Sequence, residues 1–210
     1  IRTTVFFKGC PLHCLWCHNP ESQQHKQEML YDREKCMLCG MCAKVCPRWA
    51  IAEVGNSMVT DLARCDFCGE CVIYCIAGAR EIAGKEYTVD EVVQEVVKDK
   101  VFYDQSGGGV TLSGGEPLVQ VDFVEELLRR LQAEGIHTAV DTCGAVPFAH
   151  LQRVAKYTDL FLYDLKLVDD PKHKDFTGGS NQGIIENLRK LTTLHNDVQL
   201  RMPIIEGVNA

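Results

Sequence analysis

The stretch that decides the fold is the beginning of the chain, which reads IRTTVFFKGCPLHCLWC over residues 1–17. Arg2–Phe7 is rich in β-branched and aromatic residues, which predicts a short buried strand. Three cysteines follow it closely, Cys10, Cys14 and Cys17, with the spacing C-x3-C-x2-C. The strand therefore carries a loop with three thiols at its carboxyl end.

Strands and helices alternate along much of the remaining chain. Strands are predicted at Val110–Leu112, Thr138–Asp141, Leu160–Leu165 and Val198–Pro203. Apolar residues at helical spacing predict helices at Val89–Val97 (capped by Thr88), Phe123–Leu131 (ending near Gly135), Phe148–Lys156 and Ile184–Leu194. This alternation indicates an α/β fold with a parallel sheet, in which the chemistry sits at the carboxyl ends of the strands.

Polar and small residues follow each predicted strand. They are Ser113-Gly114-Gly115-Glu116-Pro117, Asp141-Thr142-Cys143-Gly144, Asp164-Leu165-Lys166 and Arg201-Met202-Pro203. Each segment alone is a weak signal, since Asp164 and Lys166 could be a solvated ion pair of little energetic value. No G-K-[ST] sequence follows the glycines, which excludes a P-loop. Taken together, the segments predict one rim of polar groups that faces the three thiols.

The chain has 12 cysteines in 210 residues, and all but Cys143 precede residue 76. Eight of them form two runs of the pattern C-x2-C-x2-C-x3-C, and the second run starts 29 residues after the first. A disulfide framework fits poorly, because the spacings are tight and the cysteine-poor remainder can build its own core. Zinc would explain a pair of C-x2-C units, but not the third and fourth cysteine of each run.

The repeated run is typical of two [4Fe–4S] clusters, in which the fourth cysteine of each run binds the cluster of the other. One cluster would use Cys36, Cys39, Cys42 and Cys75, and the other would use Cys65, Cys68, Cys71 and Cys46. Pro47 follows Cys46 as the bacterial ferredoxin run expects, whereas Ile76 follows Cys75. We therefore expect a ferredoxin-like insert at residues 32–81, with residues 1–31 and 82–210 forming the α/β domain.

The triplet Cys10, Cys14 and Cys17 lacks a fourth cysteine nearby. A cluster held by three thiolates leaves one iron with an open position, where a substrate can coordinate. The alternative is that Cys143 is the fourth ligand and that the site only carries electrons. The spacing alone leaves both possibilities open.

Composition excludes several classes of protein. The chain is 46% hydrophobic and 24% charged, which is typical of a soluble, core-forming protein and argues against disorder. It has no apolar run of the roughly 18–20 residues that a membrane span needs. Its formal net charge of −7 gives no support to a nucleic-acid surface. The grouping of the cysteines favours an oxygen-sensitive cytoplasmic enzyme.

The segment Gly9–Cys17 resembles the motif of the radical S-adenosylmethionine (SAM) superfamily. The following His18-Asn19-Pro20 and the later GGEP, DTCG, YDLK and RMPIIEGVN segments are similar to the activating enzymes of glycyl radical enzymes, in the larger form with a two-cluster insert. This resemblance implies a TIM-like partial (β/α)6 barrel. It also implies that the chain lacks a short amino-terminal segment and a longer carboxyl-terminal part.

The resemblance also implies an activity. SAM would be cleaved reductively to a 5′-deoxyadenosyl radical, which removes hydrogen from a backbone glycine of a partner glycyl radical enzyme. The implied cofactors are three [4Fe–4S] clusters and SAM, and the implied electron donor is a flavodoxin or ferredoxin. We expect a monomer. Two other functions remain open: a radical SAM oxidoreductase acting on a small molecule or peptide, and a polyferredoxin-like electron carrier without catalysis.

Roles for single residues follow from the same resemblance. Cys10, Cys14 and Cys17 would hold the catalytic cluster, and the turn of Gly114, Gly115 and Glu116 would receive the methionyl ammonium of SAM. Trp16 would pack near the adenine. Asp141 and Asp164 would bind a monovalent cation, with backbone groups near Thr142 and Leu162, while Lys166 and Arg201 would bind SAM. His13 and His18 are expected to make polar loop contacts, and Cys143 is expected to pack or to face the partner. The insert clusters would relay electrons, staple the insert or form a docking platform.

Overall fold

A computed structural model describes residues 1–210. The chain divides into two compact units: the first combines Ile1–His25 with Glu86–Ala210, and the second is Lys26–Lys85. The predicted insert, residues 32–81, lies within the second unit. None of the helices combines the length and apolar character that a membrane crossing requires.

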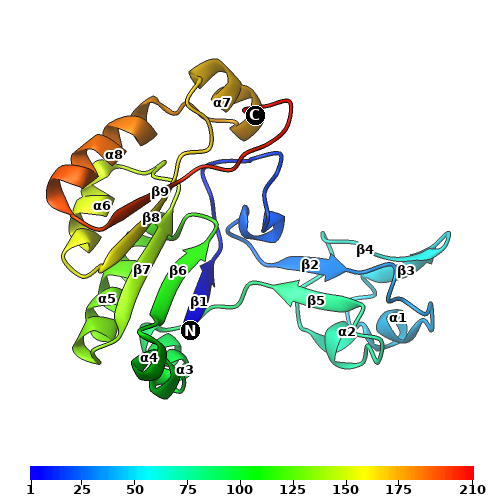
Figure 1. Cartoon of the computed structure of the whole chain (residues 1–210). Coiled ribbons are helices and arrows are strands. Elements are labelled where there is room, and N and C mark those ends of the chain that lie inside the picture. Colours follow the sequence, from blue (N-terminus) through cyan, green and yellow to red (C-terminus); the bar gives the residue numbers. More distant parts are fainter. The chain divides into compact units, whose positions relative to one another are not determined.

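The first unit is built on one parallel sheet (Figure 1). Its strands are β1 (Arg2–Phe7), β6 (Gly109–Gly114), β7 (His137–Thr142), β8 (Leu160–Asp164) and β9 (Val198–Arg201), in that spatial order. All four neighbouring pairs are parallel. The predicted α/β fold with a parallel sheet is therefore confirmed, and the strand order follows the order along the chain.

Helices connect these strands. They are α3 (Val89–Val97), α4 (Lys100–Ser106), α5 (Val121–Ala133), α6 (Phe148–Ala155), α7 (Asp170–Thr177) and α8 (Gln182–Leu194), with short 3-10 turns at Pro20–Ser22 and Pro117–Gln120. Helix α5 packs against α3 and α6, and α6 packs against α8. The periodicity predicted α3, α5, α6 and α8. It did not predict α4 or α7, because α4 has only 7 residues and α7 is mostly polar.

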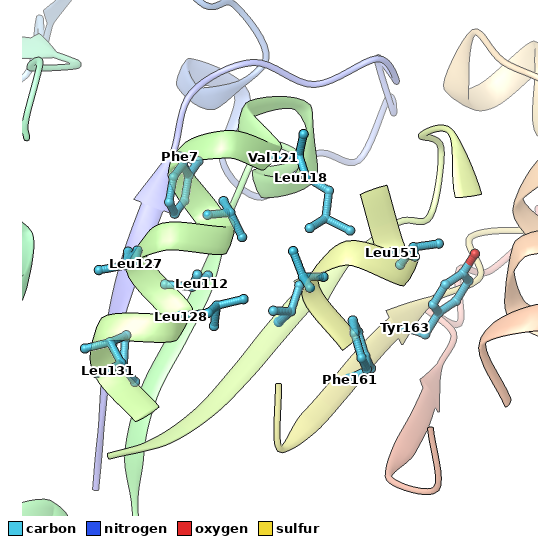
Figure 2. Close-up of a cluster of buried hydrophobic side chains, with 14 of the residues drawn as sticks. Phe7, Leu112, Leu118, Val121, Leu127, Leu128, Leu131, Leu151, Phe161 and Tyr163 are labelled. Atoms are coloured by element: carbon cyan, nitrogen blue, oxygen red, sulfur yellow. The ribbon is translucent and has the colours of Figure 1, made fainter. Parts of the chain in front are cut away.

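The core of the first unit lies between α5, α6 and the sheet, as Figure 2 shows. Leu127, Leu128 and Leu131 of α5 have no exposed surface, and neither has Leu112 of β6. These are the apolar positions of the predicted helix and strand, so the stripe on α5 is explained by packing alone. This packed layer fixes the strands, whose carboxyl ends form the site described below.

The second unit contains two antiparallel two-stranded sheets and two short helices (Figure 1). Strand β2 (Glu28–Tyr31) pairs with β5 (Arg80–Ala83), and β3 (Ile51–Val54) pairs with β4 (Ser57–Thr60). The helices are α1 (Met41–Val45) and α2 (Glu70–Ile73). The two halves of the repeat have matching backbones, since Gly40 and Gly69 precede the helices with φ of 69° and 84°. The left-handed conformation that both positions require explains the repeated glycine.

Candidate active site at the carboxyl ends of the strands

A cavity of about 510 Å³ opens at the carboxyl ends of the strands in the first unit. The residues that line it come from the loop after β1 and from the ends of β6, β7, β8 and β9. They are Cys10, Leu12, Cys14, Trp16, Cys17, His18, Asn19, Ser22, Ser113, Gly114, Gly115, Asp141, Cys143, Asp164, Lys166, Arg201, Met202 and Pro203. The strand-end segments singled out in the sequence thus meet at one rim, as predicted.

Backbone hydrogen bonds join the loop that carries Cys10, Cys14 and Cys17 (the thiol loop) to the turn of Gly114 and Gly115 at the end of β6 (the glycine turn). Glu116 N–H donates to the carbonyl of Gly9 at 2.8 Å, and Gly115 N–H donates to that of Phe7 at 2.8 Å. A Cβ at Gly115 would collide with the carbonyl oxygen of Gly9 and would lie 2.6 Å from that of Ser22. The second glycine of the turn is therefore required because the loop backbone passes directly against it.

Helix α7 holds the other side of the thiol loop, a contact that the sequence did not predict. The N–H groups of His13 and Leu15 donate to the carbonyls of Thr177 and Phe176 at 2.7 and 3.0 Å. The Trp16 ring lies 5.9 Å from the Phe176 ring, centroid to centroid. Between its bonds to α7 and its bonds to the glycine turn, the loop presents three thiols to one cavity.

The turn that follows α7 is itself fixed by buried hydrogen bonds. His173 is fully buried, and its Nδ1 lies 2.6 Å from the carbonyl oxygen of Gly179. The Thr177 hydroxyl donates to the carbonyl of His173 at 2.7 Å. The signals for this element were the Asp169 cap and the proline after it, at Pro171. They mark the start of a helix but give no indication of its contact with the thiol loop.

A continuous polar network lines the opposite wall of the cavity. Ser113 Oγ donates to Asp141 at 2.9 Å, and the Arg201 guanidinium bonds to both Asp141 and Asp164, the latter at 2.8 Å. Lys166 Nζ donates to the second oxygen of Asp164 at 2.6 Å. These five side chains come from four strand ends. Arg201 bridges the two carboxylates, and Lys166 bonds to Asp164.

Burial and the neighbouring charges shift the pKa values of the groups in this network in opposite directions. Burial raises the pKa of Asp141, although Arg201 opposes that shift. For Lys166, burial by itself would lower the pKa, but the neighbouring charge of Asp164 raises it overall. Both Lys166 and Arg201 therefore remain cationic near neutral pH, and a bound carboxylate would meet two positive groups there.

Glu116 does not line the cavity. Its carboxylate is fully buried and accepts hydrogen bonds from Thr142 Oγ1 at 2.8 and 2.9 Å, from Cys143 N–H at 2.8 Å and from Leu118 N–H at 3.1 Å. Burial raises its pKa, and these donors favour the ionised form. Glu116 and Thr142 thus brace the end of β7, whereas the other predicted SAM-binding residues face the cavity.

The fourth thiol of this region, Cys143, is 7% exposed and lines the cavity together with the triplet. A hydrogen bond between the thiols of Cys10 and Cys143 lowers the pKa of Cys10 and raises that of Cys143. Burial raises the pKa of Cys14 to about 11. A thiol with a raised pKa loses its proton on binding a metal, so loading this site with iron releases protons. His18 also lines the cavity, but the side chain of His13 is exposed.

The second unit has two smaller cavities, each lined by four cysteines. One is lined by Cys36, Cys39, Cys42 and Cys75, and the other by Cys46, Cys65, Cys68 and Cys71. These are the two groups that the spacing predicts, each made of three cysteines from one run and the fourth from the other. Backbone N–H groups of Ala50 and Ala79 each lie 3.3 Å from a cysteine sulfur, at equivalent places in the repeat. Soft sulfur ligands in this number suit iron–sulfur clusters.

Comparison with known proteins agrees with this geometry. The family model of the radical SAM superfamily matches residues 63–210, and that of the 4Fe-4S binding domain matches residues 29–51. The whole chain is 51% identical to the trans-4-hydroxy-L-proline dehydratase activating enzyme of Clostridioides difficile, of which it spans 70%. It is 42% identical to the (2S)-3-sulfopropanediol sulfolyase activating enzyme of Bilophila wadsworthia, of which it spans 71%.

A solved domain of a pyruvate-formate lyase-activating enzyme from Bacteroides vulgatus is 38% identical over 49% of this chain and 63% of that domain, with a TM-score of 0.46. The sequence likeness to activating enzymes covers the entire chain.

The fold and the site define a radical SAM enzyme with additional iron–sulfur binding. Within that superfamily, the chain belongs to the activating enzymes of glycyl radical enzymes. It uses a [4Fe–4S] cluster to cleave SAM reductively, and it generates a glycyl radical on a partner enzyme.

Proposed function

We propose that the partner of this activating enzyme is a glycyl radical enzyme that dehydrates trans-4-hydroxy-L-proline. The observation that carries this proposal is the 51% identity to the hydroxyproline dehydratase activating enzyme over the whole chain. Two relatives named for other partners, the (2S)-3-sulfopropanediol sulfolyase activating enzyme of Bilophila wadsworthia and the choline trimethylamine-lyase activating enzyme of Oleidesulfovibrio alaskensis, are 42% and 39% identical. We further propose that the enzyme is a cytoplasmic monomer that receives its electron from a flavodoxin or ferredoxin.

The test is anaerobic mixing of the reconstituted protein with SAM, a reductant and a candidate partner. With a hydroxyproline dehydratase we expect the electron paramagnetic resonance (EPR) signal of a glycyl radical, and with a choline lyase we expect little or none. A stronger signal on the choline lyase would contradict the proposed partner. SAM cleavage that yields a radical on neither protein, but a modified small molecule instead, would favour the alternative oxidoreductase.

We also assign roles to the side chains of the cavity. Cys10, Cys14 and Cys17 hold the catalytic cluster and leave one iron open, and the bound cluster with SAM supplies the 5′-deoxyadenosyl radical. Trp16 contacts the adenine, because it lines the cavity next to the thiols. Gly114 and Gly115 present backbone groups to the methionyl ammonium, while Glu116 acts by holding the end of β7 in position.

Lys166 and Arg201 bind the methionyl carboxylate, since both are cations of the cavity wall. A monovalent cation is also proposed beside Asp141 and Asp164. It would compete with Arg201, whose guanidinium bonds to both of these carboxylates. A dependence of SAM affinity on the potassium concentration would support the cation site.

Three [4Fe–4S] clusters are proposed for the whole chain: one in the cavity of the first unit and one in each four-cysteine cavity of the second, which forms the ferredoxin-like domain. The two cavities support this count, because each is lined by four thiols. Iron and sulfide analysis of the reconstituted protein measures it. A content equal to one or two clusters would contradict the proposal.

Replacing Lys166 with Met should weaken SAM binding without loss of iron. The change removes a partly buried cation that is 22% exposed and bonded to Asp164 at 2.6 Å. A hydrogen bond to a charged group contributes about 1.5–3 kcal/mol, so we expect affinity to fall roughly 10- to 100-fold. Titration of the cluster spectrum with SAM measures the change. Lys190→Met on the exposed surface of α8 is the matched control, and equal affinities of the two variants would remove Lys166 from the site.

A further inference from the structure

The 29-residue repeat relates the two four-cysteine cavities of the second unit. Met58 in the cavity of Cys36, Cys39, Cys42 and Cys75 corresponds to Met29 in the other cavity, 29 positions earlier. The linings differ, however, in one buried position. By the same relation Arg80 in the first cavity corresponds to Ile51 in the second. One site therefore has a cation where its pseudo-symmetric counterpart has an apolar side chain.

Arg80 is held firmly and is almost entirely buried. It is 3% exposed, its Nη1 donates to Thr60 Oγ1 at 2.7 Å, and its Nη2 donates to the carbonyl of Met58 at 2.6 Å. The guanidinium carbon lies 5.1 Å from the centre of the Tyr31 ring, and Tyr31 lines the same cavity.

One donor of this guanidinium has no acceptor. The Nε of Arg80 is buried and makes no hydrogen bond within the protein. Buried donors without a partner are rare in folded proteins, and each one calls for an explanation such as a bound group. The cavity that Arg80 lines contains four cysteine sulfurs, so a cluster bound there would bring sulfur acceptors to it.

The other charged residues also make the first cavity more positive than the second. Arg80 is the charged residue in the lining of the first cavity. The second cavity is lined by Arg48, Asp66 and Glu70, which together carry one positive and two negative charges. Arg48 and Asp66 form an exposed ion pair at 2.7 Å. Their counterparts in the first cavity, at the same repeat positions, are uncharged: Ala77, Met37 and Met41.

We propose that Arg80 makes the two insert clusters electrochemically different, by donating its free Nε–H to a sulfur of the cluster held by Cys36, Cys39, Cys42 and Cys75. This inference rests on the proposed cluster content of the insert. Reduction adds one negative charge to a cluster, and a buried cation with a hydrogen bond to sulfur stabilises that charge. The cluster beside Arg80 therefore has the higher reduction potential, and an electron that enters the insert resides there.

The charge of Arg80 also acts on Cys71 in the other cavity. The two clusters are nevertheless unequally affected, because Arg80 lines the cavity of Cys36, Cys39, Cys42 and Cys75 and does not line the other cavity. The measurable quantity is thus the difference between the two midpoint potentials. That difference should shrink when the arginine is replaced by an uncharged side chain of similar length.

The experiment is a redox titration of the reconstituted full chain, followed by EPR, on the wild type, Arg80→Met and Arg80→Lys. Arg48→Met removes the same charge from the exposed rim of the other cavity and is the matched control. Cys39→Ala, which deletes a ligand of the first cluster, assigns the signals. We expect two insert transitions in the wild type, with the one at higher potential missing in Cys39→Ala.

In Arg80→Met the upper transition should shift to lower potential, while the lower one changes less. Arg80→Lys keeps the charge but lacks the Nε–H and should give an intermediate shift. Arg48→Met should leave the upper transition in place. The proposal is overturned if Arg80→Met and Arg80→Lys, both with full iron content, leave the gap unchanged or move both transitions equally. If Arg80→Met loses iron, Arg80→Lys decides alone. A wild-type insert that contains fewer than two clusters would instead contradict the proposed cluster content.

Discussion

Replacing Cys14 with Ala is expected to abolish SAM cleavage while the clusters of the second unit remain. Cys14 lines the cavity with Cys10 and Cys17, and the loop that carries all three is bonded to the glycine turn and to α7. Three thiolates are the minimum set for a cluster with one open iron, so a missing thiolate removes the cluster and not only part of its function. The loss of activity should be complete within detection, and iron should fall by about one cluster per chain.

Cys68→Ala is the matched control for this result. Cys68 is an exposed cysteine that lines a four-cysteine cavity of the second unit. It too should cost about one cluster of iron. The first unit should keep its SAM-dependent change in the cluster spectrum, because its thiols belong to a separate compact unit. If Cys14→Ala and Cys68→Ala lost the same spectral response to SAM, the separation of the catalytic cluster from the insert would be wrong.

The sequence predicted the layers of the first unit well, because its strands and helices have strong apolar patterns. Leu127, Leu128 and Leu131 recur at helical spacing and are fully buried, and β1 spans Arg2–Phe7 as expected. Strand ends in a parallel sheet must share one edge. This topological rule, applied to Asp141, Asp164 and Arg201, was therefore enough to predict one cavity rim.

What the sequence could not predict were contacts between distant segments. Helix α7 has no apolar stripe, so hydrophobic periodicity does not predict it. Its hydrogen bonds to the thiol loop use backbone carbonyls, which every residue has, so the side chains give no indication of the contact. In the second unit, β2 and β5 each have four residues, too short for an alternating pattern to stand out. The burial of Glu116 was also unforeseen, because a glutamate after two glycines is equally compatible with a cavity wall or with the interior.

Substitution of Glu116 is expected to destabilise the protein more than any other substitution in the site outside the thiols. The Glu116 carboxylate is fully buried and accepts hydrogen bonds from Thr142 Oγ1, Cys143 N–H and Leu118 N–H. In Glu116→Ala all three donors lose their acceptor inside the protein, and each unsatisfied buried donor costs about 1–3 kcal/mol. The total loss in the free energy of unfolding should be about 3–5 kcal/mol, as for other broken buried networks. Glu116→Gln keeps one oxygen acceptor and should lose about 1–2 kcal/mol.

Anaerobic urea unfolding of the holoprotein, followed by circular dichroism, measures these differences. Glu126→Ala is the control, because Glu126 lies on the exposed side of α5, where its ion pair with Arg129 is worth at most about 1 kcal/mol. The same variants separate a bracing role from direct contact with SAM. If Glu116 braces β7, Glu116→Gln should lose stability and SAM affinity together, because Asp141 lies on the same strand. If Glu116→Gln kept its full stability and lost only SAM affinity, Glu116 would have to turn into the cavity and bind the methionyl ammonium directly.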